Sequence, residues 1–229
     1  MIDDDAAELR AQLADALMAD GSIRSGTWHD VFAVVPRHLF LPAFFRQTSD
    51  YAAWELVTAG SSEWLRLIYQ DRTWVTQLDG DERKSAAAAV TEGSVTGTPS
   101  SSSTAPGLMA LMLEALRLRG DERVLEIGTG TGYNAALLSE RLGESRVTTI
   151  EVDPVIARQA ETDLSRAGYA PKLVTGDGLA GFPHEAPYDR VIATCAAPAV
   201  PRAWIDKPAP VGSSSPTWRV TSAAECLCC

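Results

Sequence analysis

The chain has 229 residues and a formal net charge of −10, because 20 lysines and arginines stand against 30 aspartates and glutamates. An acidic protein does not attract nucleic acid through its long-range field, so no nucleic-acid partner is expected. The sequence has no apolar run of about 18 residues, and its first residues, Met1-Ile2-Asp3-Asp4-Asp5, are acidic where a signal peptide is basic. We therefore expect a cytoplasmic protein without a membrane partner.

The cysteines and histidines form no recognisable site. Cys195 is isolated in an apolar run, and the other cysteines lie together near the C-terminus: Cys226, Cys228 and Cys229. This spacing is not a disulfide framework, and the tail has neither a histidine nor a second cysteine pair at zinc-ligand spacing, so we expect no metal site. We expect His29, His38 and His184 to be surface or structural side chains.

The N-terminal part of the chain begins with helical patterns. Apolar residues at helical spacing predict an amphipathic helix over residues 3–20 that ends near Gly21. The apolar segment 28–42 contains two prolines that stop regular structure, and we expect it to cover a core. Together these patterns predict a mostly helical N-terminal subdomain over residues 1–107.

Two stretches of this subdomain lack a helical pattern. Residues 51–81 alternate aromatic and polar side chains, and residues 91–106 consist mainly of Gly, Ser, Thr and Pro. Composition alone predicts that the second stretch is a loop or a flexible linker. A helix resumes over residues 108–118, and we expect Gly120 to close it.

From residue 123 onward, strand and helix patterns alternate. In chain order these elements cover residues 123–127 (strand), 133–142 (helix), 146–152 (strand), 155–167 (helix), 172–174 (strand) and 189–193 (strand). Strands separated by helices of this length imply right-handed crossovers and a parallel sheet. We therefore expect an α/β fold with a Rossmann-like, doubly wound sheet over residues 108–205.

A glycine-rich turn follows the first of these strands. Gly128, Gly130 and Gly132 occupy alternate positions before the next helix, with Thr129 between the first two. Glycines in such a turn allow backbone amides to approach a ligand closely. Glu151 ends the second strand about 20 residues later, where nucleotide-binding folds hold ribose hydroxyls with an acidic side chain. This context predicts a binding site rather than a tight turn alone.

The spacing of the glycines discriminates between nucleotide ligands. A dinucleotide fingerprint is Gly-x-Gly-x-x-Gly, whereas this chain has Gly-x-Gly-x-Gly preceded by the acidic Glu126. A carboxylate at the lip of the pocket disfavours a pyrophosphate and attracts the sulfonium and ammonium groups of S-adenosylmethionine. We expect Asp177, in the turn after the third strand, to face an adenine amino group. The expected cofactor residues are Glu126, Gly128, Thr129, Gly130, Gly132, Glu151, Asp177 and Gly178.

One stretch resembles the first methyltransferase motif of the protein-L-isoaspartate O-methyltransferase family: residues 124–138, with the sequence VLEIGTGTGYNAALL. Further similar stretches are residues 35–42, 176–178 with 186–192, and 196–201, so that the resemblance covers about residues 28–205 except for 43–95. It implies a class I methyltransferase fold. It also implies S-adenosylmethionine-dependent methylation of the carboxylate of isoaspartyl or aspartyl residues in proteins or peptides, as in protein repair.

The resemblance also implies catalytic residues. In this family a loop with the pattern Ser-x-Pro covers the transferred methyl group and contacts the substrate carboxylate. The matching residues here are Ser103-Thr104-Ala105-Pro106, so Thr104 stands in place of the serine and Ser103 is a second candidate. Because a carboxylate is already anionic at neutral pH, the reaction depends on alignment and desolvation rather than on a strong general base.

The C-terminal part departs from the family. After Ile205, family members continue with a helix, a Pro-Gly-Gly turn and strands that complete the sheet, whereas residues 206–229 contain three prolines between 208 and 216. We expect an irregular tail, a sheet that lacks its last strands, and a fourth strand (189–195) near an exposed edge. Such an abrupt change is typical of a truncated or frame-shifted reading of a longer gene.

Three alternative functions stay open. The poor match over residues 43–95 favours a tailoring enzyme that methylates an aspartate in a ribosomally made peptide. The aborted C-terminus favours a non-catalytic fragment that binds the cofactor or a partner without turnover. The spacing of the glycines disfavours a dinucleotide-dependent oxidoreductase.

Overall fold

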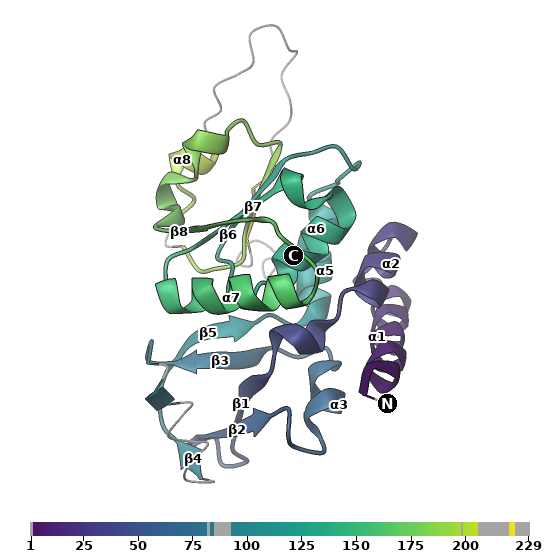
Figure 1. Ribbon diagram of the computed structural model, residues 1–229, viewed down its shortest axis with the longest axis vertical. Helices are drawn as coiled ribbons and strands as arrows, with labels where there is room; N and C mark the ends of the chain where they lie inside the picture. The colour runs from purple at the N-terminus through teal and green to yellow at the C-terminus, as the bar shows by residue number, and fades with distance from the viewer. Residues whose placement is uncertain (1, 82, 85–92, 198, 206–219, 223–229) are drawn as a thin grey trace, which may run out of the picture.

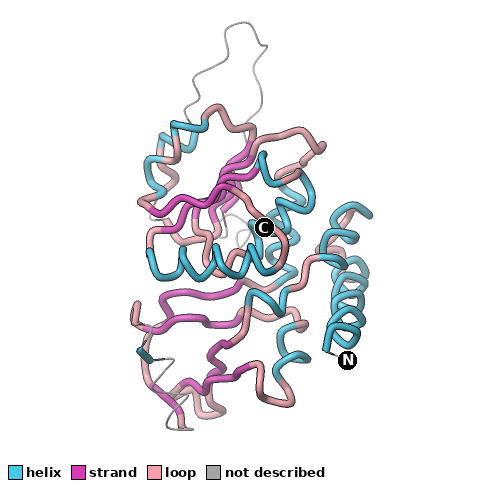
Figure 2. The backbone as a smooth tube through the Cα atoms, in the orientation of Figure 1, coloured by secondary structure: helices cyan, strands magenta, loops and turns pink. Residues whose placement is uncertain are grey.

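The computed structural model describes residues 2–81, 83–84, 93–197, 199–205 and 220–222, which contain two β-sheets, the helices packed against them and a group of N-terminal helices (Figure 1). The parallel sheet occupies the upper half of the view and the antiparallel sheet the lower half, with helix α7 (Pro154–Arg166) crossing between them. Helices α1 (Ile2–Ala19) and α2 (Gly26–Val34) lie beside both sheets. Figure 2 shows the strands of the two sheets in magenta.

The N-terminal helices have clear local causes. Helix α1 confirms the helix predicted over residues 3–20. Helix α2 begins after Ser25, whose hydroxyl accepts a hydrogen bond from the Trp28 amide at 3.3 Å and so caps the first turn. It ends before Pro36, because a residue that precedes proline is disfavoured in a helix, and the short 3-10 helix η1 (Arg37–Phe40) follows. Within the described residues, no helix is long and apolar enough to cross a membrane.

Five strands between residues 43 and 103 form an antiparallel sheet, so the expectation of a mostly helical subdomain needs correction beyond residue 40. Helix α3 (Trp64–Ile68) is the only helix between the first and third of its strands in the described chain. The strands are β1 (Ala43–Gln47), β2 (Trp54–Thr58), β3 (Trp74–Leu78), β4 (Ser94–Val95) and β5 (Pro99–Ser103), in the spatial order β4-β2-β1-β3-β5.

Strand β5 shows why composition was misleading. Its sequence, Pro-Ser-Ser-Ser-Ser, has low strand propensity, and the prediction of a linker there was wrong. The strand exists because it pairs with β3, with Trp74 opposite Ser103 and Val75 opposite Ser102. Irregularities in the register near Gln77 accommodate the pairing. Cross-strand pairing and not local preference therefore decides the conformation of β5.

Helix α5 (Pro106–Ala115) connects the two halves of the molecule. Pro106 occupies its first turn, where the missing amide hydrogen costs nothing. The helix ends five residues before the predicted stop at Gly120, because Arg117 adopts a positive φ of 51° that a helix does not allow.

The parallel sheet confirms the predicted α/β fold. Its strands follow the spatial order β10-β9-β6-β7-β8, and every neighbouring pair in this order is parallel. The elements are β6 (Val124–Ile127), α6 (Tyr133–Leu142), η2 (Glu144–Arg146), β7 (Val147–Glu151), α7, β8 (Lys172–Thr175), η3 (Gly178–Ala180), η4 (Pro183–Glu185), β9 (Arg190–Ala193), α8 (Arg202–Ile205) and β10 (Val220–Ser222).

Strand β10 corrects the expectation of an exposed edge at the fourth strand. Val220 lies opposite Val191 and Ser222 opposite Ala193, so β9 is paired on both sides over this length. The predicted irregular tail falls on residues 206–219 and 223–229, which lie outside the described residues. The division of the chain at residue 107 stays a prediction.

One hydrophobic core joins the N-terminal helices to the parallel sheet. Its buried side chains include Trp28 and Phe32 from α2, Leu113 from α5, Tyr133 from α6 and Leu164 from α7. A second cluster contains Leu125, Ile127, Ile150, Val191 and Trp204. Because residues 125 and 127 of β6 belong to this second cluster and Val124 belongs to the first, the two clusters cover opposite faces of the parallel sheet.

Candidate functional site

A cavity of about 560 Å³ lies where the strands of the parallel sheet end. One wall consists of the glycine turn after β6, the end of β7, the turn after β8 and the loop after β9. The other wall is β5 with Thr104, contributed by the antiparallel sheet. The position is the usual one for ligands in open α/β sheets, at the carboxyl ends of the strands.

The three glycines of the turn have different physical roles, although all adopt positive φ: 94° at Gly128, 54° at Gly130 and 87° at Gly132. A Cβ at Gly128 would lie 2.9 Å from Cβ of Cys195, and one at Gly132 would lie 3.1 Å from Cγ of Leu164. These two positions therefore require glycine for packing. At Gly130 the nearest atom is 3.9 Å away, so this residue leaves its backbone open to the cavity.

Glu126 is fully buried, which corrects the expectation that it lies at the lip of the pocket. The reason is topological: β6 is paired with β9 on one side and β7 on the other, and all four of its residues are buried. Its carboxyl oxygens accept hydrogen bonds from Asn134 Nδ2 at 2.7 Å and from Thr149 Oγ1 at 2.6 Å. Desolvation raises the pKa of Glu126 to about 7, so the group beneath the cavity is partly protonated at neutral pH.

Glu151 lies beside the glycine turn, as the sequence predicted for the end of the second strand. Its Oε2 accepts a hydrogen bond from the Gly130 amide at 2.9 Å, and its Oε1 accepts one from the Asp153 amide at 3.1 Å. A carboxylate offers about four acceptor positions, so each oxygen retains capacity for a further donor. The side chain is 7% exposed, and it lines the cavity.

Asp177 and Gly178 form the third part of this wall. The Asp177 carboxylate is exposed and accepts a hydrogen bond from the Leu179 amide at 2.9 Å, which caps η3. A Cβ at Gly178 would lie 2.5 Å from Cγ2 of Ile127, so only glycine allows the turn to approach β6 this closely. The Gly178 carbonyl accepts a hydrogen bond from Trp204 Nε1 at 2.8 Å, which holds the turn against helix α8.

Ser103 and Thr104 lie on the opposite wall. Ser103 is buried at the end of β5, and Thr104 is half-buried with its carbonyl accepting a hydrogen bond from Arg37 Nη2 at 3.1 Å. The atom nearest to the Cβ position of Gly130 is the carbonyl oxygen of Ser102, so β5 faces the glycine turn directly. The structure thus brings both catalytic candidates and the cofactor candidates into one cavity, except for Gly132, which packs against Leu164 and is not part of the lining.

Two apolar side chains of the lining escaped the sequence analysis. Val152 is 69% exposed and Leu179 is 49% exposed, and both line the cavity next to acidic site residues. Large exposed apolar groups at the mouth of a cavity are typical of a ligand-binding surface. Their positions in the sequence could have indicated this role, because Val152 directly follows Glu151 and Leu179 directly follows Gly178.

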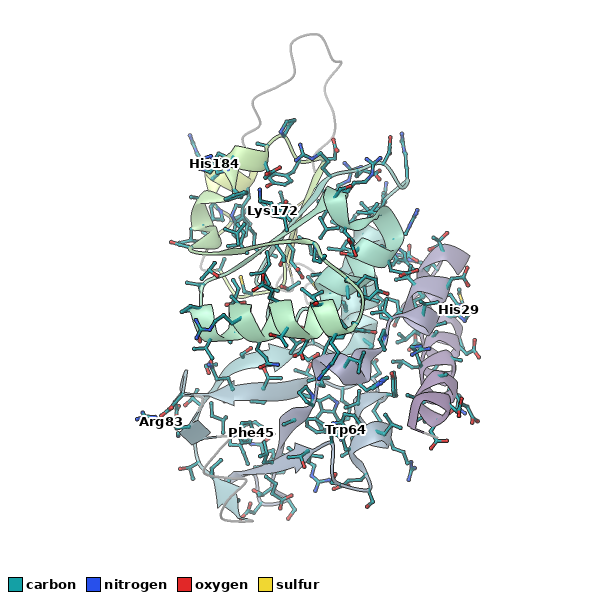
Figure 3. The ribbon with its side chains drawn as sticks, viewed as in Figure 1. His29, Phe45, Trp64, Arg83, Lys172 and His184 are labelled. Atoms are coloured by element: carbon teal, nitrogen blue, oxygen red, sulfur yellow. The ribbon has the colours of Figure 1, made fainter. Side chains whose placement is uncertain are left out.

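The histidines lie away from the described lining. Figure 3 shows His29 on the N-terminal helices at the right and His184 at the upper left, in the half that holds the parallel sheet. His29 Nε2 lies 2.8 Å from the Asp15 carboxylate, and this contact raises the pKa of His29. His38 is buried, with Nδ1 at 2.7 Å from the Tyr69 hydroxyl. The described residues also contain no group of three side chains that is suited to hold a metal ion.

The sequence matches known proteins over most of its length. Residues 85–213 match the family Protein-L-isoaspartate(D-aspartate) O-methyltransferase (PCMT). A protein-L-isoaspartate O-methyltransferase of Hyperthermus butylicus is 33% identical over 215 residues, which cover 90% of this chain and 73% of that protein. One of Methanoculleus marisnigri is 47% identical over 103 residues, which cover 44% of this chain and 46% of that protein. With several of the curated relatives, the match therefore spans only about half of the relative's length.

Solved structures show the same architecture. A protein-L-isoaspartate O-methyltransferase superposes with a TM-score of 0.63 and 31% identity, over 86% of this chain and 51% of that chain. A putative protein-L-isoaspartate O-methyltransferase from Plasmodium falciparum, in complex with S-adenosyl-L-homocysteine, superposes with a TM-score of 0.59 over 86% of this chain and 78% of that chain. At 14% identity this second structure supports the fold alone. The chain belongs to the protein-L-isoaspartate(D-aspartate) O-methyltransferase family, and its parallel sheet has the class I methyltransferase fold.

Proposed function

We propose that the protein transfers a methyl group from S-adenosylmethionine to the carboxylate of an isoaspartyl residue in a protein or peptide, as in protein repair in the cytoplasm. The observation that carries this proposal is the cavity with two unlike walls. The glycine turn and Glu151 form one wall, and β5 with Thr104 forms the other. A methyl donor and a peptide can occupy such a cavity at the same time and meet at its centre.

The cofactor wall fits S-adenosylmethionine. Gly130 leaves room for a ligand against its backbone, and the free acceptor positions of Glu151 suit the two ribose hydroxyls. Val152 and Leu179 provide apolar surface for the adenine ring, with Asp177 close by for its amino group. Gly128, Thr129, Gly132 and Gly178 shape the turns that hold these groups in place. The relative from Plasmodium falciparum was solved with the demethylated form of the same cofactor.

Glu126 interacts electrostatically with the bound cofactor. Its carboxyl belongs to the floor of the cavity and is held by Asn134 and Thr149. When bound, S-adenosylmethionine supplies an electrophilic methyl group on a cationic sulfonium. A cation above Glu126 favours its ionised form, so cofactor binding and deprotonation of Glu126 support each other.

The opposite wall fits a peptide substrate. The Thr104 hydroxyl, with Ser103 beside it, would hold the substrate carboxylate in line with the methyl group. The carboxylate oxygen forms the new bond to the methyl carbon while the carbon–sulfur bond breaks and its electron pair remains on sulfur. No proton is transferred, which agrees with a lining that contains no histidine in the described chain. The protein's contribution is alignment and exclusion of water.

Methyl-transfer assays with a matched pair of peptides test the proposal. We expect methylation of an isoaspartyl hexapeptide and little or none of the same peptide with ordinary aspartate. Preferred turnover of a constrained aspartyl peptide would assign the tailoring function instead. Cofactor binding in calorimetry without methylation of either peptide would show a non-catalytic fragment, and tighter binding of a nicotinamide dinucleotide than of S-adenosylhomocysteine would overturn the cofactor.

A further inference from the structure

Two side chains outside the cavity lining, Gln77 and Arg37, connect its two walls. The first is Gln77, a residue of β3 that is only 9% exposed. Its Oε1 accepts a hydrogen bond from Ser100 Oγ at 2.8 Å, and its Nε2 donates to Asp153 Oδ2 at 3.2 Å. One amide group thus connects the β5 wall to Asp153, the residue that caps the start of α7 on the cofactor side.

This connection continues to the glycine turn. The Asp153 amide donates to Glu151 Oε1 at 3.1 Å, and Glu151 Oε2 accepts from the Gly130 amide at 2.9 Å. Gly130 in turn faces the Ser102 carbonyl on β5. Ser100, Gln77, Asp153, Glu151 and Gly130 therefore form a hydrogen-bonded path that leads from one wall to the other.

The second connection is Arg37, whose side chain is fully buried. It donates hydrogen bonds to four backbone carbonyls: Ile68 at 2.7 Å, Gln70 at 3.1 Å, Arg72 at 3.2 Å and Thr104 at 3.1 Å. Its guanidinium carbon also lies 5.8 Å from the ring centroid of Tyr133, the residue that directly follows Gly132 and begins α6. Arg37 therefore contacts both the Thr104 backbone on the β5 wall and the first residue of the helix that follows the glycine turn.

We propose that Gln77 and Arg37 are positioning residues that set the distance between the two walls, and hence between the transferred methyl group and the substrate carboxylate. This inference rests on the proposed function. Methyl transfer requires the reacting atoms to lie about 3 to 3.5 Å apart, and a displacement of about 1 Å costs up to about 100-fold in rate. When the hydrogen bonds of Gln77 or Arg37 are removed, each wall can still bind its own ligand, but the two ligands are misaligned.

The decisive variant is Gln77→Met, which keeps the length of the side chain and removes both hydrogen bonds. We expect kcat for an isoaspartyl peptide to fall about tenfold, while KM for the peptide and Kd for S-adenosylhomocysteine stay within about threefold. The matched control is Thr76→Val. Thr76 Oγ1 donates to Ser101 Oγ at 3.1 Å and so joins β3 to β5 without crossing the cavity. This control should keep the parental kcat.

Arg37→Lys tests the second connection, since lysine keeps the charge but lacks the planar fork of donors. We expect a larger loss of kcat than in Gln77→Met, together with a lower Tm because some carbonyls lose their donor. Should Arg37→Lys fail to fold, Gln77→Met still decides the matter. A folded Gln77→Met protein with unchanged kcat, or one in which cofactor affinity falls as far as kcat, would overturn the proposal.

Hydrogen exchange gives a readout that needs no turnover. In the parent, S-adenosylhomocysteine should slow amide exchange in residues 99–104 of the β5 wall, and Gln77→Met should reduce this protection at least threefold while the glycine turn stays protected. Equal protection in parent and variant would contradict the positioning role. An inactive parent that shows the coupling, and loses it in Gln77→Met, would retain the positioning role and remove the proposed function.

Discussion

The two walls of the cavity come from sequences of opposite kinds. The cofactor wall rests on the fully buried strands β6 and β7 and on a turn whose three glycines adopt positive φ. The wall opposite is a run of serines at the edge of an antiparallel sheet, and that run has little preference for strand. The first wall is determined locally by its residue types, while the second acquires its structure only through β3. Substitutions should therefore act on the two walls in different ways.

The largest effect should come from Gly130→Val on the cofactor wall. The new side chain would fill the open space against the backbone of Gly130, so we expect affinity for S-adenosylhomocysteine to fall by more than about 100-fold, or about 3 kcal/mol. Isothermal titration calorimetry with S-adenosylhomocysteine measures this change in affinity. Gly168→Val is the control, because Gly168 also has a positive φ, of 85°, but has no atom near its Cβ position. An equal loss of affinity in both variants would mean that backbone strain, and not occupation of the cavity, is responsible.

The next effect concerns stability and the buried carboxyl of Glu126. Its folded pKa of about 7 is higher than the ordinary value of 4.5, so the native state binds more protons between these values. The stabilising contribution is complete below pH 4.5 and is lost as the pH rises through 7, by on the order of 3 kcal/mol. Urea unfolding from pH 4.5 to 8 should show this loss in the parent relative to Glu126→Gln. Parallel curves for the two proteins would exclude a raised pKa.

Glu151→Ala tests whether the cofactor wall holds the ribose of the cofactor. Two ribose hydroxyls lose a charged acceptor, and we expect cofactor binding to weaken by roughly 1 to 3 kcal/mol. The control is Glu161→Ala, which removes an exposed carboxylate from α7 that does not line the cavity. If both variants bind S-adenosylhomocysteine as tightly as the parent, the cofactor site lies elsewhere.

The smallest effect is expected on the serine-rich wall. Thr104→Val keeps the shape of the side chain and removes its hydroxyl, so kcat/KM for an isoaspartyl peptide should fall about tenfold, or about 1.4 kcal/mol, with cofactor affinity within about twofold. Thr104→Ser keeps the hydroxyl and should retain or improve turnover. Unchanged kinetics in Thr104→Val would transfer the role to Ser103, where Ser103→Ala is the corresponding test.

The contrast also explains what the sequence could predict. The strand, glycine turn and helix from Val124 to Leu142 were predictable because hydrophobic runs and glycines are local signals. The burial of Glu126 was not, since it depends on β6 lying between β9 and β7. The hydrogen bonds of Gln77 and Arg37 between the walls were equally unpredictable, because Gln77 and Asp153 are 76 residues apart in sequence and Arg37 and Thr104 are 67 apart. No local pattern encodes such pairs.

The shared hydrophobic core has a consequence for how the protein unfolds. Phe44 and Trp74 of the antiparallel sheet belong to the same buried cluster as Tyr133 and Leu164 of the parallel half. Opening either half exposes apolar surface of the other, so both should melt in a single cooperative transition. Natural variation then acts on the two halves as one unit. Two core substitutions that lower the free energy of unfolding equally, one beneath β5 and one beside the glycine turn, reduce the folded fraction of the cofactor site by the same factor.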